Sequence, residues 1–198
     1  MVKTLILGAA GQIARVTTDL FLETTNLQLV LYARNAASRL KPYANEPRVS
    51  LVDGDVTDGV KLEAAMAGVD GVYANLSGDM VEQARTIINA MHNAKVKRLI
   101  FVSSMGIYDE VPGQRYSGIL DPYRDSALAI EASDLDYTII RPEWLNDLDE
   151  IAYGTTRKGE PFKNPQAYVS RKSVADLIVK CTTVPGFGIG ESLGVHKV

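Results

Sequence analysis

Two glycines, Gly8 and Gly11, lie three residues apart in the stretch ILGAAGQIAR (6–15), between a short apolar run and a segment with helical spacing. The first glycine permits a sharp turn from strand to helix, and the second lets the backbone approach a bound group closely. N–H groups at the start of the helix would then bind a phosphate at the positive end of the helix dipole. The spacing predicts a dinucleotide site, with tight packing of the turn as the alternative reading. The residues assigned to this turn are Gly8, Ala10, Gly11, Gln12 and Ile13.

The end of the second apolar run, LYARN, carries Arg34 and no nearby acidic residue. NAD sites commonly place an acidic residue here for the ribose hydroxyls, whereas an arginine accommodates a 2′-phosphate. Arg15 on the first helical turn, and Arg39, add positive charge. The pattern favours NADPH over NADH; the alternative is that Arg34 is only a solvated residue leaving a strand.

The motif GDVTD (54–58) closes the third apolar run. Asp55 is expected to accept a hydrogen bond from an adenine amino group, while the backbone of Val56 contacts the ring. A calcium loop starting at Asp53 is excluded, because its sixth position would be Asp58 instead of glycine and its twelfth Ala64 instead of glutamate. Capping of the next helix by Thr57 or Asp58 is the alternative for this motif.

The elements that must position these residues alternate along the chain. The expected strands are 2–7, 27–33, 48–53, 69–76, 97–104 and 136–142, with a closing strand in ESLGVHKV. The first helix is expected to start near Gln12, and further helices are expected over 36–41, 60–68, 80–94 and 122–133. A last helix is expected around 174–181, capped by Ser170. Such alternation predicts an α/β fold of the Rossmann type, a doubly wound parallel sheet with helices on both faces. We expect one domain over 1–198, with 142–170 as a small substrate-side lobe.

Composition narrows the function classes. The 198 residues are 46% hydrophobic and 23% charged with a net charge of −3, which argues against nucleic acid and membrane partners. Cys181 is the single cysteine, and His92 and His196 are the two histidines, so we expect no metal site. We predict a cytoplasmic protein that is a monomer or a small homo-oligomer.

Several motifs occur together and in order: GAAGQIA, Arg34, GDV, ANLSG (74–78), FVSSMGIY (101–108) and LDYTIIRPEWL (135–145). This set resembles the atypical short-chain dehydrogenase/reductase group, and within it the small NAD(P)H-binding reductases related to the NmrA and biliverdin/flavin reductase families. The resemblance runs from Val2 to the closing strand, and it is specific for fold and cofactor but not for substrate.

The resemblance implies further site residues after three of the strands. Asn75, Leu76 and Ser77 would line the ribose, and Ser103 and Ser104 would lie beside the nicotinamide. Pro142, Glu143 and Trp144 would meet the carboxamide, mainly through backbone groups. These positions follow predicted strands, where open α/β sheets bind ligands.

Many dehydrogenases of this class use a Tyr-x-x-x-Lys pair to handle the substrate proton. Four residues after Tyr108, Tyr116 and Tyr123 stand Pro112, Leu120 and Ala127, so we expect this pair to be missing. Tyr123 occupies the expected region at a helix start, where it would line the substrate pocket or simply pack.

Without that acid, a conjugated acceptor is favoured, because a flavin, quinone or tetrapyrrole delocalises the charge that follows hydride transfer. We therefore predict an NADPH-dependent reductase of a small-molecule electron acceptor, with Ser103 or Ser104 as polar contact and Tyr123 nearby. The alternative is a non-catalytic NADP(H)-binding redox sensor that acts through a protein partner. A nucleotide-sugar epimerase or dehydratase is a third reading and ranks last, because it requires the tyrosine–lysine pair and usually a larger substrate lobe.

Overall fold

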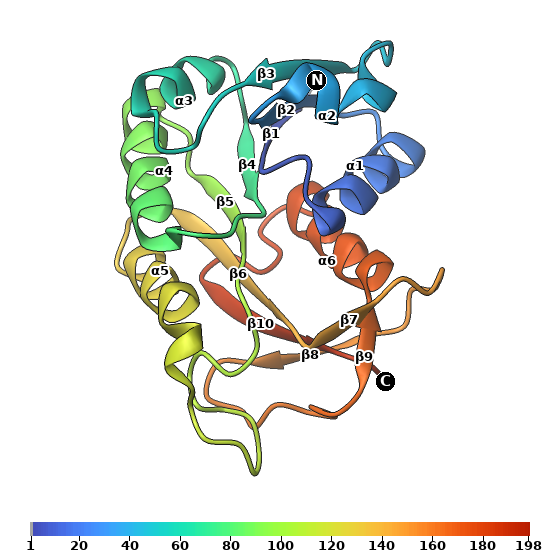
Figure 1. Ribbon diagram of the computed structural model, residues 1–198, viewed down its shortest axis with the longest axis vertical. Coiled ribbons are helices and arrows are strands. Elements are labelled where there is room, and N and C mark those ends of the chain that lie inside the picture. The colour runs from blue at the N-terminus through green and yellow to red at the C-terminus, as the bar shows by residue number, and fades with distance from the viewer. Residues whose placement is uncertain (1) are drawn as a thin grey trace.

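The computed structural model describes residues 2–198, in which eight strands form one central sheet (Figure 1). These strands are β1 (Lys3–Leu7), β2 (Gln28–Ala33), β3 (Val49–Asp53), β4 (Gly71–Ala74), β5 (Arg98–Val102), β6 (Asp136–Pro142), β8 (Gly154–Arg157) and β10 (Glu191–His196). Their spatial order is β3-β2-β1-β4-β5-β6-β10-β8, and β8 alone runs antiparallel to its neighbour. The first six strands have the Rossmann order, which confirms the predicted α/β class.

Helices cover both faces of this sheet (Figure 1). They are α1 (Gln12–Thr24), α2 (Ala36–Arg39), α3 (Gly59–Ala65), α4 (Met80–Ala94), α5 (Asp121–Glu131) and α6 (Arg171–Thr183), with short 3₁₀ turns η1 (Lys41–Tyr43) and η2 (Gly118–Leu120). Helices α3, α4 and α5 lie on one face, and α1 packs against α6 on the other. Among the described residues, no helix is long and apolar enough to cross a membrane.

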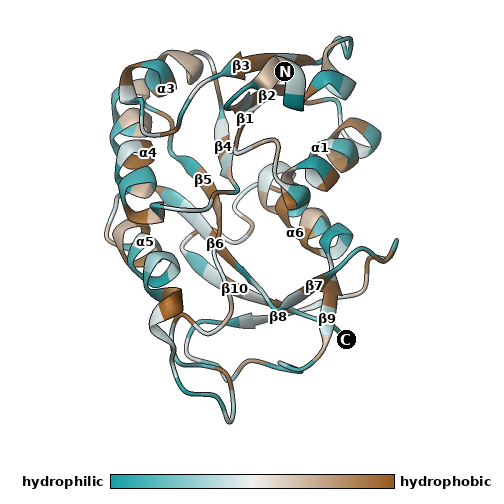
Figure 2. Cartoon of the chain, in the orientation of Figure 1, coloured by the Kyte–Doolittle hydropathy of each residue, from teal (hydrophilic) through white to brown (hydrophobic). Residues whose placement is uncertain are grey.

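The strands are apolar on both sides because each face of the sheet is covered. In β1, Leu5 and Leu7 belong to the core beneath α3–α5, whereas Ile6 belongs to the core beneath α1 and α6. Figure 2 shows hydrophobic residues along the central strands and hydrophilic ones on the outer parts of the helices. Two cores on one sheet are what a doubly wound fold requires.

The predicted elements all occur, with ends shifted by a few residues. The strand expected over 69–76 is β4 (Gly71–Ala74), and the strand expected over 97–104 is β5 (Arg98–Val102). The residues trimmed from these strands, Asn75–Leu76 and Ser103–Ser104, become loops at their carboxyl ends. The helix caps also agree: Asp58 accepts from the Lys61 N–H at the start of α3, so the capping alternative for GDVTD holds for Asp58.

The segment 142–170 contains three short strands that the sequence did not predict. Besides β8, they are β7 (Trp144–Asn146) and β9 (Tyr168–Ser170), which pair with each other in parallel as a separate two-stranded sheet. Trp144 lies directly opposite Tyr168 in this pairing, and both side chains are exposed. The assignment of 142–170 as a substrate-side lobe of a single domain stays a prediction.

Replacing Ser170 by alanine should lower the free energy of unfolding by about 1 kcal/mol. The buried Ser170 Oγ accepts from the Ser173 N–H (2.9 Å) at the start of α6 and donates to the Glu150 carbonyl (2.6 Å). Urea denaturation would measure the loss. Thr183→Ala at the exposed end of the same helix is the control, and a similar loss in both variants would contradict the capping role.

Candidate functional site

A first pocket, which we call the glycine-turn pocket, lies at the carboxyl ends of β1 to β4 and has a volume of about 150 Å³. The residues that line it are Gly8, Ala10, Gly11, Tyr32, Ala33, Arg34, Arg39, Gly54, Asp55, Val56, Asn75, Leu76, Ser77 and Gln83. The structure therefore brings together residues from four strand ends that are up to 69 positions apart in sequence, from Gly8 to Ser77. It does so because parallel strands all end at the same edge of the sheet.

Both glycines of the turn are needed for a close approach. Gly8 has φ +69°, and a Cβ there would lie 2.1 Å from the carbonyl oxygen of Asn75. A Cβ on Gly11 would lie 2.5 Å from the Asn75 side-chain nitrogen. The packing alternative thus accounts for part of the glycine pattern, because the loop after β4 occupies the space a side chain would need. The turn still opens onto the pocket, so tight packing and a dinucleotide site are compatible explanations of the two glycines.

The start of α1 is arranged to receive an anion. Gly11 is its N-cap, no side chain caps the helix, and the first turn holds no acidic residue. The first N–H groups of a helix have no partner within the helix, so they and the helix dipole attract negative charge. Gln12 and Ile13 supply backbone groups at this point, while the Ile13 side chain is buried in the core beneath.

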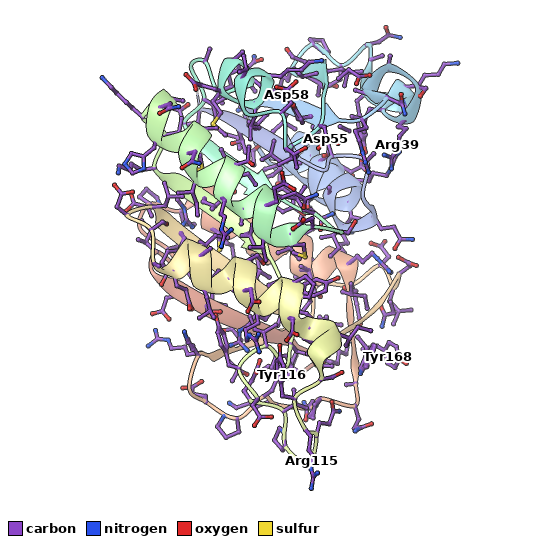
Figure 3. All side chains as sticks on the ribbon, turned by 60° about the vertical axis from the view of Figure 1, so that its left-hand side comes forward. Arg39, Asp55, Asp58, Arg115, Tyr116 and Tyr168 are labelled. Atoms are coloured by element: carbon purple, nitrogen blue, oxygen red, sulfur yellow. The ribbon has the colours of Figure 1, made fainter. Side chains whose placement is uncertain are left out.

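Two arginines border the glycine-turn pocket. Arg34 Nη1 lies 3.7 Å from Asp55 Oδ2, and the two side chains are 73% and 45% exposed. A pair this open contributes little, so Arg34 remains free to turn toward another anion. Arg39 comes from α2, and Figure 3 shows its side chain at the same end of the molecule as Asp55.

The acidic groups near these arginines are held by other donors. Asp53 accepts from the N–H groups of Asn35 (3.3 Å) and Ala36 (3.2 Å) at the start of α2. Asp55 Oδ1 accepts from the N–H (3.0 Å) and the hydroxyl (2.8 Å) of Thr57, which lowers the pKa of that carboxyl; Arg34 lowers it further. Asp55 is therefore an ionised acceptor at neutral pH.

Arg15 was predicted to add charge to the cofactor site, but the structure gives its guanidinium other partners. Its Nε donates to the Ala10 carbonyl (3.2 Å), and its Nη2 donates to the Arg39 carbonyl. Arg15 does not line the glycine-turn pocket. It connects the turn to the end of α2, which makes it a positioning residue for the part of α2 that carries Arg39.

A second pocket, which we call the β5–β6 pocket, lies at the ends of those two strands and has a volume of about 240 Å³. Its lining is Ser104, Met105, Gly106, Asp109, Val111, Gln114, Arg115, Tyr116, Ser117, Ile119, Leu120, Pro142, Glu143 and Trp144. The two pockets follow one another along the carboxyl edge, because β4 pairs with β5 and β5 with β6. Tyr116 and Arg115 lie far from Asp55 and Arg39 in Figure 3.

The predicted catalytic residues separate in the structure. Ser104 lines the β5–β6 pocket, and its hydroxyl donates to the Met105 carbonyl (3.1 Å). Ser103 is buried and donates to the Tyr123 carbonyl (3.3 Å). Tyr123 is half-buried, packs on the core beneath α5, and lines neither pocket. Of the three, Ser104 is the one that the structure brings to the pocket wall.

A buried ion pair holds the wall of the β5–β6 pocket in place. Arg141 of β6 is fully buried and pairs with Glu110, whose carboxylate also accepts from the N–H groups of Gly106 (3.0 Å) and Tyr108 (2.9 Å). Arg141 donates in addition to the Ser192 hydroxyl (3.0 Å). The pair therefore fixes the loop after β5 against β6 at the point where that loop borders the pocket.

Glu143, at the end of β6, has an unusual environment for a carboxyl group. It is 4% exposed, Oε1 accepts from the backbone N–H of Lys197 (2.6 Å), and Oε2 has no hydrogen-bond partner. Burial raises the pKa of this carboxyl, and the single hydrogen bond lowers it less. Buried acids of this kind cluster at functional sites, because desolvation disfavours the charged form.

Glu143→Gln should make the protein more stable than wild type at high pH, with no advantage at low pH. The folded-state pKa of Glu143 is raised, so its stabilising contribution is present below about 4.3 and is lost as pH rises through the raised value. Glutamine keeps an acceptor for the Lys197 N–H. Its side chain does not ionise, so the variant does not lose stability from this group as pH rises. Urea denaturation across pH 4 to 9 measures the difference, and parallel curves for the two proteins would contradict it.

The expectation that no tyrosine carries a lysine four residues on is wrong: Tyr168 and Lys172 have this spacing. The pair was missed because it lies far beyond the region where the motif is expected. Tyr168 is on β9 and is 56% exposed, whereas Lys172 is on α6 and pairs with Asp149. Figure 3 shows Tyr168 away from Tyr116, and neither member of the pair lines either pocket.

Sequence reasoning did not assign several residues that the structure brings into the pockets. Tyr32 donates to the Asp55 carbonyl (2.9 Å), and burial together with nearby aspartates raises its pKa to about 12. A Cβ on Gly54 would lie 2.1 Å from the Tyr32 hydroxyl oxygen, so the glycine of GDVTD was a usable signal. Tyr116 was considered only for a lysine four residues on, and no local pattern links it to Glu143.

The strand order is that of a Rossmann-type protein, and the glycine-turn pocket lies where such sheets bind dinucleotides. The family model described as NAD(P)H-binding matches residues 8–185. The chain therefore belongs to this NAD(P)H-binding family, which confirms the resemblance to the short-chain dehydrogenase/reductase group.

Two solved structures are similar over almost the whole chain. A Rossmann-fold NAD(P)-binding family protein from Shigella flexneri is 44% identical with a TM-score of 0.87, covering 100% of this chain and 94% of that one. A short-chain dehydrogenase/reductase from Veillonella parvula, solved in complex with NADP, is 27% identical with a TM-score of 0.89, covering 99% and 94%. The two TM-scores, over nearly the full length of each chain, show that both proteins share the fold described above.

Curated relatives are more distant. An uncharacterized sugar epimerase of Bacillus subtilis is 26% identical over 192 residues, which cover 89% of this chain and 86% of that protein. A cinnamoyl-CoA reductase of Oryza sativa is 34% identical over 85 residues, but the match covers 38% of this chain and 25% of that enzyme. The chain thus matches about a quarter of the length of the plant reductase.

Proposed function

We propose that the protein is an NADPH-dependent oxidoreductase that reduces a flat, conjugated small molecule such as a flavin or a quinone. The observation that carries this proposal is the pair of pockets along one sheet edge, one charged and glycine-rich, the other largely apolar. Open α/β sheets bind dinucleotides across the point where strand order reverses, here between β1 and β4. A cofactor seated there has its reactive end toward β5 and β6.

The residues of the glycine-turn pocket fit this cofactor. The uncapped start of α1 suits the pyrophosphate, with Gly11, Gln12 and Ile13 as backbone donors. Asp55 and Val56 suit the adenine, and Asn75, Leu76 and Ser77 suit the ribose. When bound, the cofactor supplies a hydride to the acceptor.

A preference for NADP over NAD follows from the charges at the adenosine end. Arg34 and Arg39 border the pocket, whereas Asp53, the nearby acid of β3, is held by the start of α2. An arginine accommodates a 2′-phosphate, and no free carboxylate of β2 stands where it would bind ribose hydroxyls. The NADP-bound Veillonella structure supports this choice.

The acceptor pocket is suited to a flat ring. Tyr116 and Trp144 offer aromatic faces, and Val111 and Leu120 offer apolar contacts. Ser104 provides a hydroxyl beside them, and Ser103 positions the strand end through its bond to the α5 backbone. The partner is thus a small-molecule electron acceptor, and we expect a monomer or a small homo-oligomer.

Stopped-flow absorbance of NADPH at a fixed concentration tests the reaction with riboflavin, FMN and menadione. We expect oxidation faster than the rate in buffer with at least one of the three. The Tyr116→Ala variant should raise the KM of that acceptor without weakening NADPH binding, because Tyr116 lines only the β5–β6 pocket and is not among the residues expected to meet the nicotinamide carboxamide. Rates equal to the buffer rate with every acceptor would refute the proposal.

A redox sensor that binds NADP(H) without turnover is the second candidate. It is favoured by the positions of Ser103 and Tyr123, whose hydroxyls do not line the acceptor pocket. Calorimetry together with the stopped-flow assay separates the two: a sensor binds NADP⁺ and NADPH with different affinities, but it neither oxidises NADPH nor reduces an acceptor. An epimerase is the third candidate, and the exposure of Tyr168 and the Lys172–Asp149 pair disfavour it.

A further inference from the structure

Glu143, a residue of the β5–β6 pocket lining, has a buried carboxyl oxygen that finds no hydrogen-bond partner among the described residues. Glu143 lines this pocket and is 4% exposed, and its Oε2 makes no hydrogen bond. Buried polar atoms are nearly always hydrogen-bonded, so an unpaired one beside a cavity needs a reason. A ligand in the cavity that accepts a hydrogen bond from a neutral carboxylic acid provides it.

The other oxygen of Glu143 fixes the orientation of the group. Oε1 accepts from the Lys197 N–H (2.6 Å), and the Glu143 N–H donates to the Val195 carbonyl (3.0 Å). β10 thus holds the carboxyl in place at the end of β6. This leaves Oε2 as the oxygen able to carry the proton, since Oε1 already accepts.

We propose that Glu143 is the proton donor of the reduction, taking the place of the tyrosine–lysine pair. This inference rests on the proposed function. The O–H bond at Oε2 breaks, and an O–H or N–H bond forms on the acceptor as it gains the hydride. The Glu143 carboxylate then regains a proton from solvent water, so charge and atoms balance over one turnover.

No cation compensates the burial of Glu143 among the described residues, so its surroundings favour the neutral form of the carboxyl. Desolvation raises its pKa, and the Lys197 N–H opposes this only in part. The Lys197 ammonium is paired with Glu150 (2.6 Å), and Arg141 is paired with Glu110. A general acid must hold its proton near the working pH, and burial without a compensating cation shifts the pKa of a carboxyl in that direction.

Other ionisable groups face the same region from β10 and the loop after β5. His196 follows Val195 on β10; its Nδ1 lies 3.1 Å from the Lys197 carbonyl, and its Nε2 is buried without a partner. Asp109 accepts from the Tyr116 N–H (3.1 Å), and Arg115 extends outward from the loop tip in Figure 3.

The hydroxyls in the pocket are weaker candidates for the donor. The Tyr116 hydroxyl donates to Asp121 (2.7 Å), and its pKa is raised by desolvation and by that bond. The Ser104 hydroxyl donates to the Met105 carbonyl (3.1 Å). Each of these protons is already engaged, whereas the Glu143 Oε2 proton is not.

Glu143→Gln tests the proposal, because glutamine keeps an acceptor for the Lys197 N–H but has no acidic proton. With NADPH and menadione, we expect kcat to fall about 100-fold, the lower end for loss of a general acid because the quinone delocalises charge. The wild-type kcat/KM should fall as pH rises through the pKa of Glu143. The kcat/KM of the variant should show no such fall with pH. Glu150→Gln is the control, because it removes the carboxylate that pairs with the Lys197 ammonium and does not line the pocket.

A measurement without turnover tests the proton itself. Protein labelled with ¹³C at the glutamate carboxyl carbons gives one NMR signal that is absent in Glu143→Gln. We expect that signal to titrate well above the ordinary glutamate pKa of about 4.3. A midpoint at or below that value would overturn the proposal, as would equal kcat and pH profiles in the variant and wild type.

The two measurements separate this inference from the proposed function. If wild type oxidises NADPH and Glu143→Gln does so equally, the reductase function stands and the role of Glu143 is wrong. If wild type shows no turnover with any acceptor, the function is wrong, and the role of Glu143 falls with it, whatever the midpoint.

Discussion

Gly8→Ala should destabilise the protein by about 2–5 kcal/mol, the largest effect expected from a single methyl group in this chain. A residue with a side chain pays about 1–2 kcal/mol for a left-handed conformation, and Gly8 has φ +69°. The new Cβ would also lie 2.1 Å from the Asn75 carbonyl oxygen, a backbone atom that cannot rotate away. Either the turn or the loop after β4 must move, and both border the glycine-turn pocket.

Gly68→Ala is the matched control for this substitution. Gly68 has the same φ of +69°, but nothing lies within 4 Å of a Cβ added there. It should cost only the conformational term of about 1–2 kcal/mol. Urea denaturation of both variants measures the difference, and calorimetry should show that Gly8→Ala also loses NADPH affinity while Gly68→Ala does not. Equal losses of stability would mean that the close approach of Asn75 is unimportant.

Arg34→Ala should weaken NADPH binding about 10- to 100-fold and leave NADH binding nearly unchanged. A hydrogen bond to a charged group contributes about 1.5–3 kcal/mol, and 1.4 kcal/mol is a factor of ten in affinity. The ion pair that Arg34 now makes with Asp55 is long and exposed, so breaking it costs little. Calorimetry of both cofactors with wild type and variant measures the change.

Three further variants make that result specific. Arg39→Ala removes the second arginine of the pocket and should also reduce the preference, and the double variant should abolish it. Arg85→Ala removes an exposed arginine of α4 that lines neither pocket and should change neither affinity. Equal affinities of wild type for NADPH and NADH would contradict the assignment of Arg34.

The glycine-turn pocket was largely predictable because each contributor follows a strand. Gly8, Arg34, Asp55 and Asn75 stand just after four apolar runs, and parallel strands bring such positions to one edge. Arg15 was expected to add positive charge to the cofactor site; helical position alone does not reveal that its guanidinium donates to the Ala10 and Arg39 carbonyls, and its role toward the cofactor stays a prediction. The strands β7, β8 and β9 were missed since each is only three or four residues long and pairs with distant residues.

The acceptor side was much less predictable. Glu143 was assigned through its backbone, yet its carboxyl is buried because Lys197, 54 residues later, lies against it. The loop that carries Tyr116 is held by the pair between Glu110 and Arg141, 31 residues apart. Ser103 and Ser104 are adjacent, and only the direction of the chain after β5 puts one in the core and the other at the pocket.

By itself the sequence determined the order of strands and helices, the Rossmann fold and the nucleotide-binding turn. Those properties depend on apolar periodicity, glycine positions and strand ends, all of which are local. The tertiary structure decided which of the candidate residues meet at a pocket and which carboxyl is deprived of water and partners. These depend on contacts between residues far apart in sequence, so Glu143 emerges as the proposed acid only when β6, β10 and the loop after β5 are assembled.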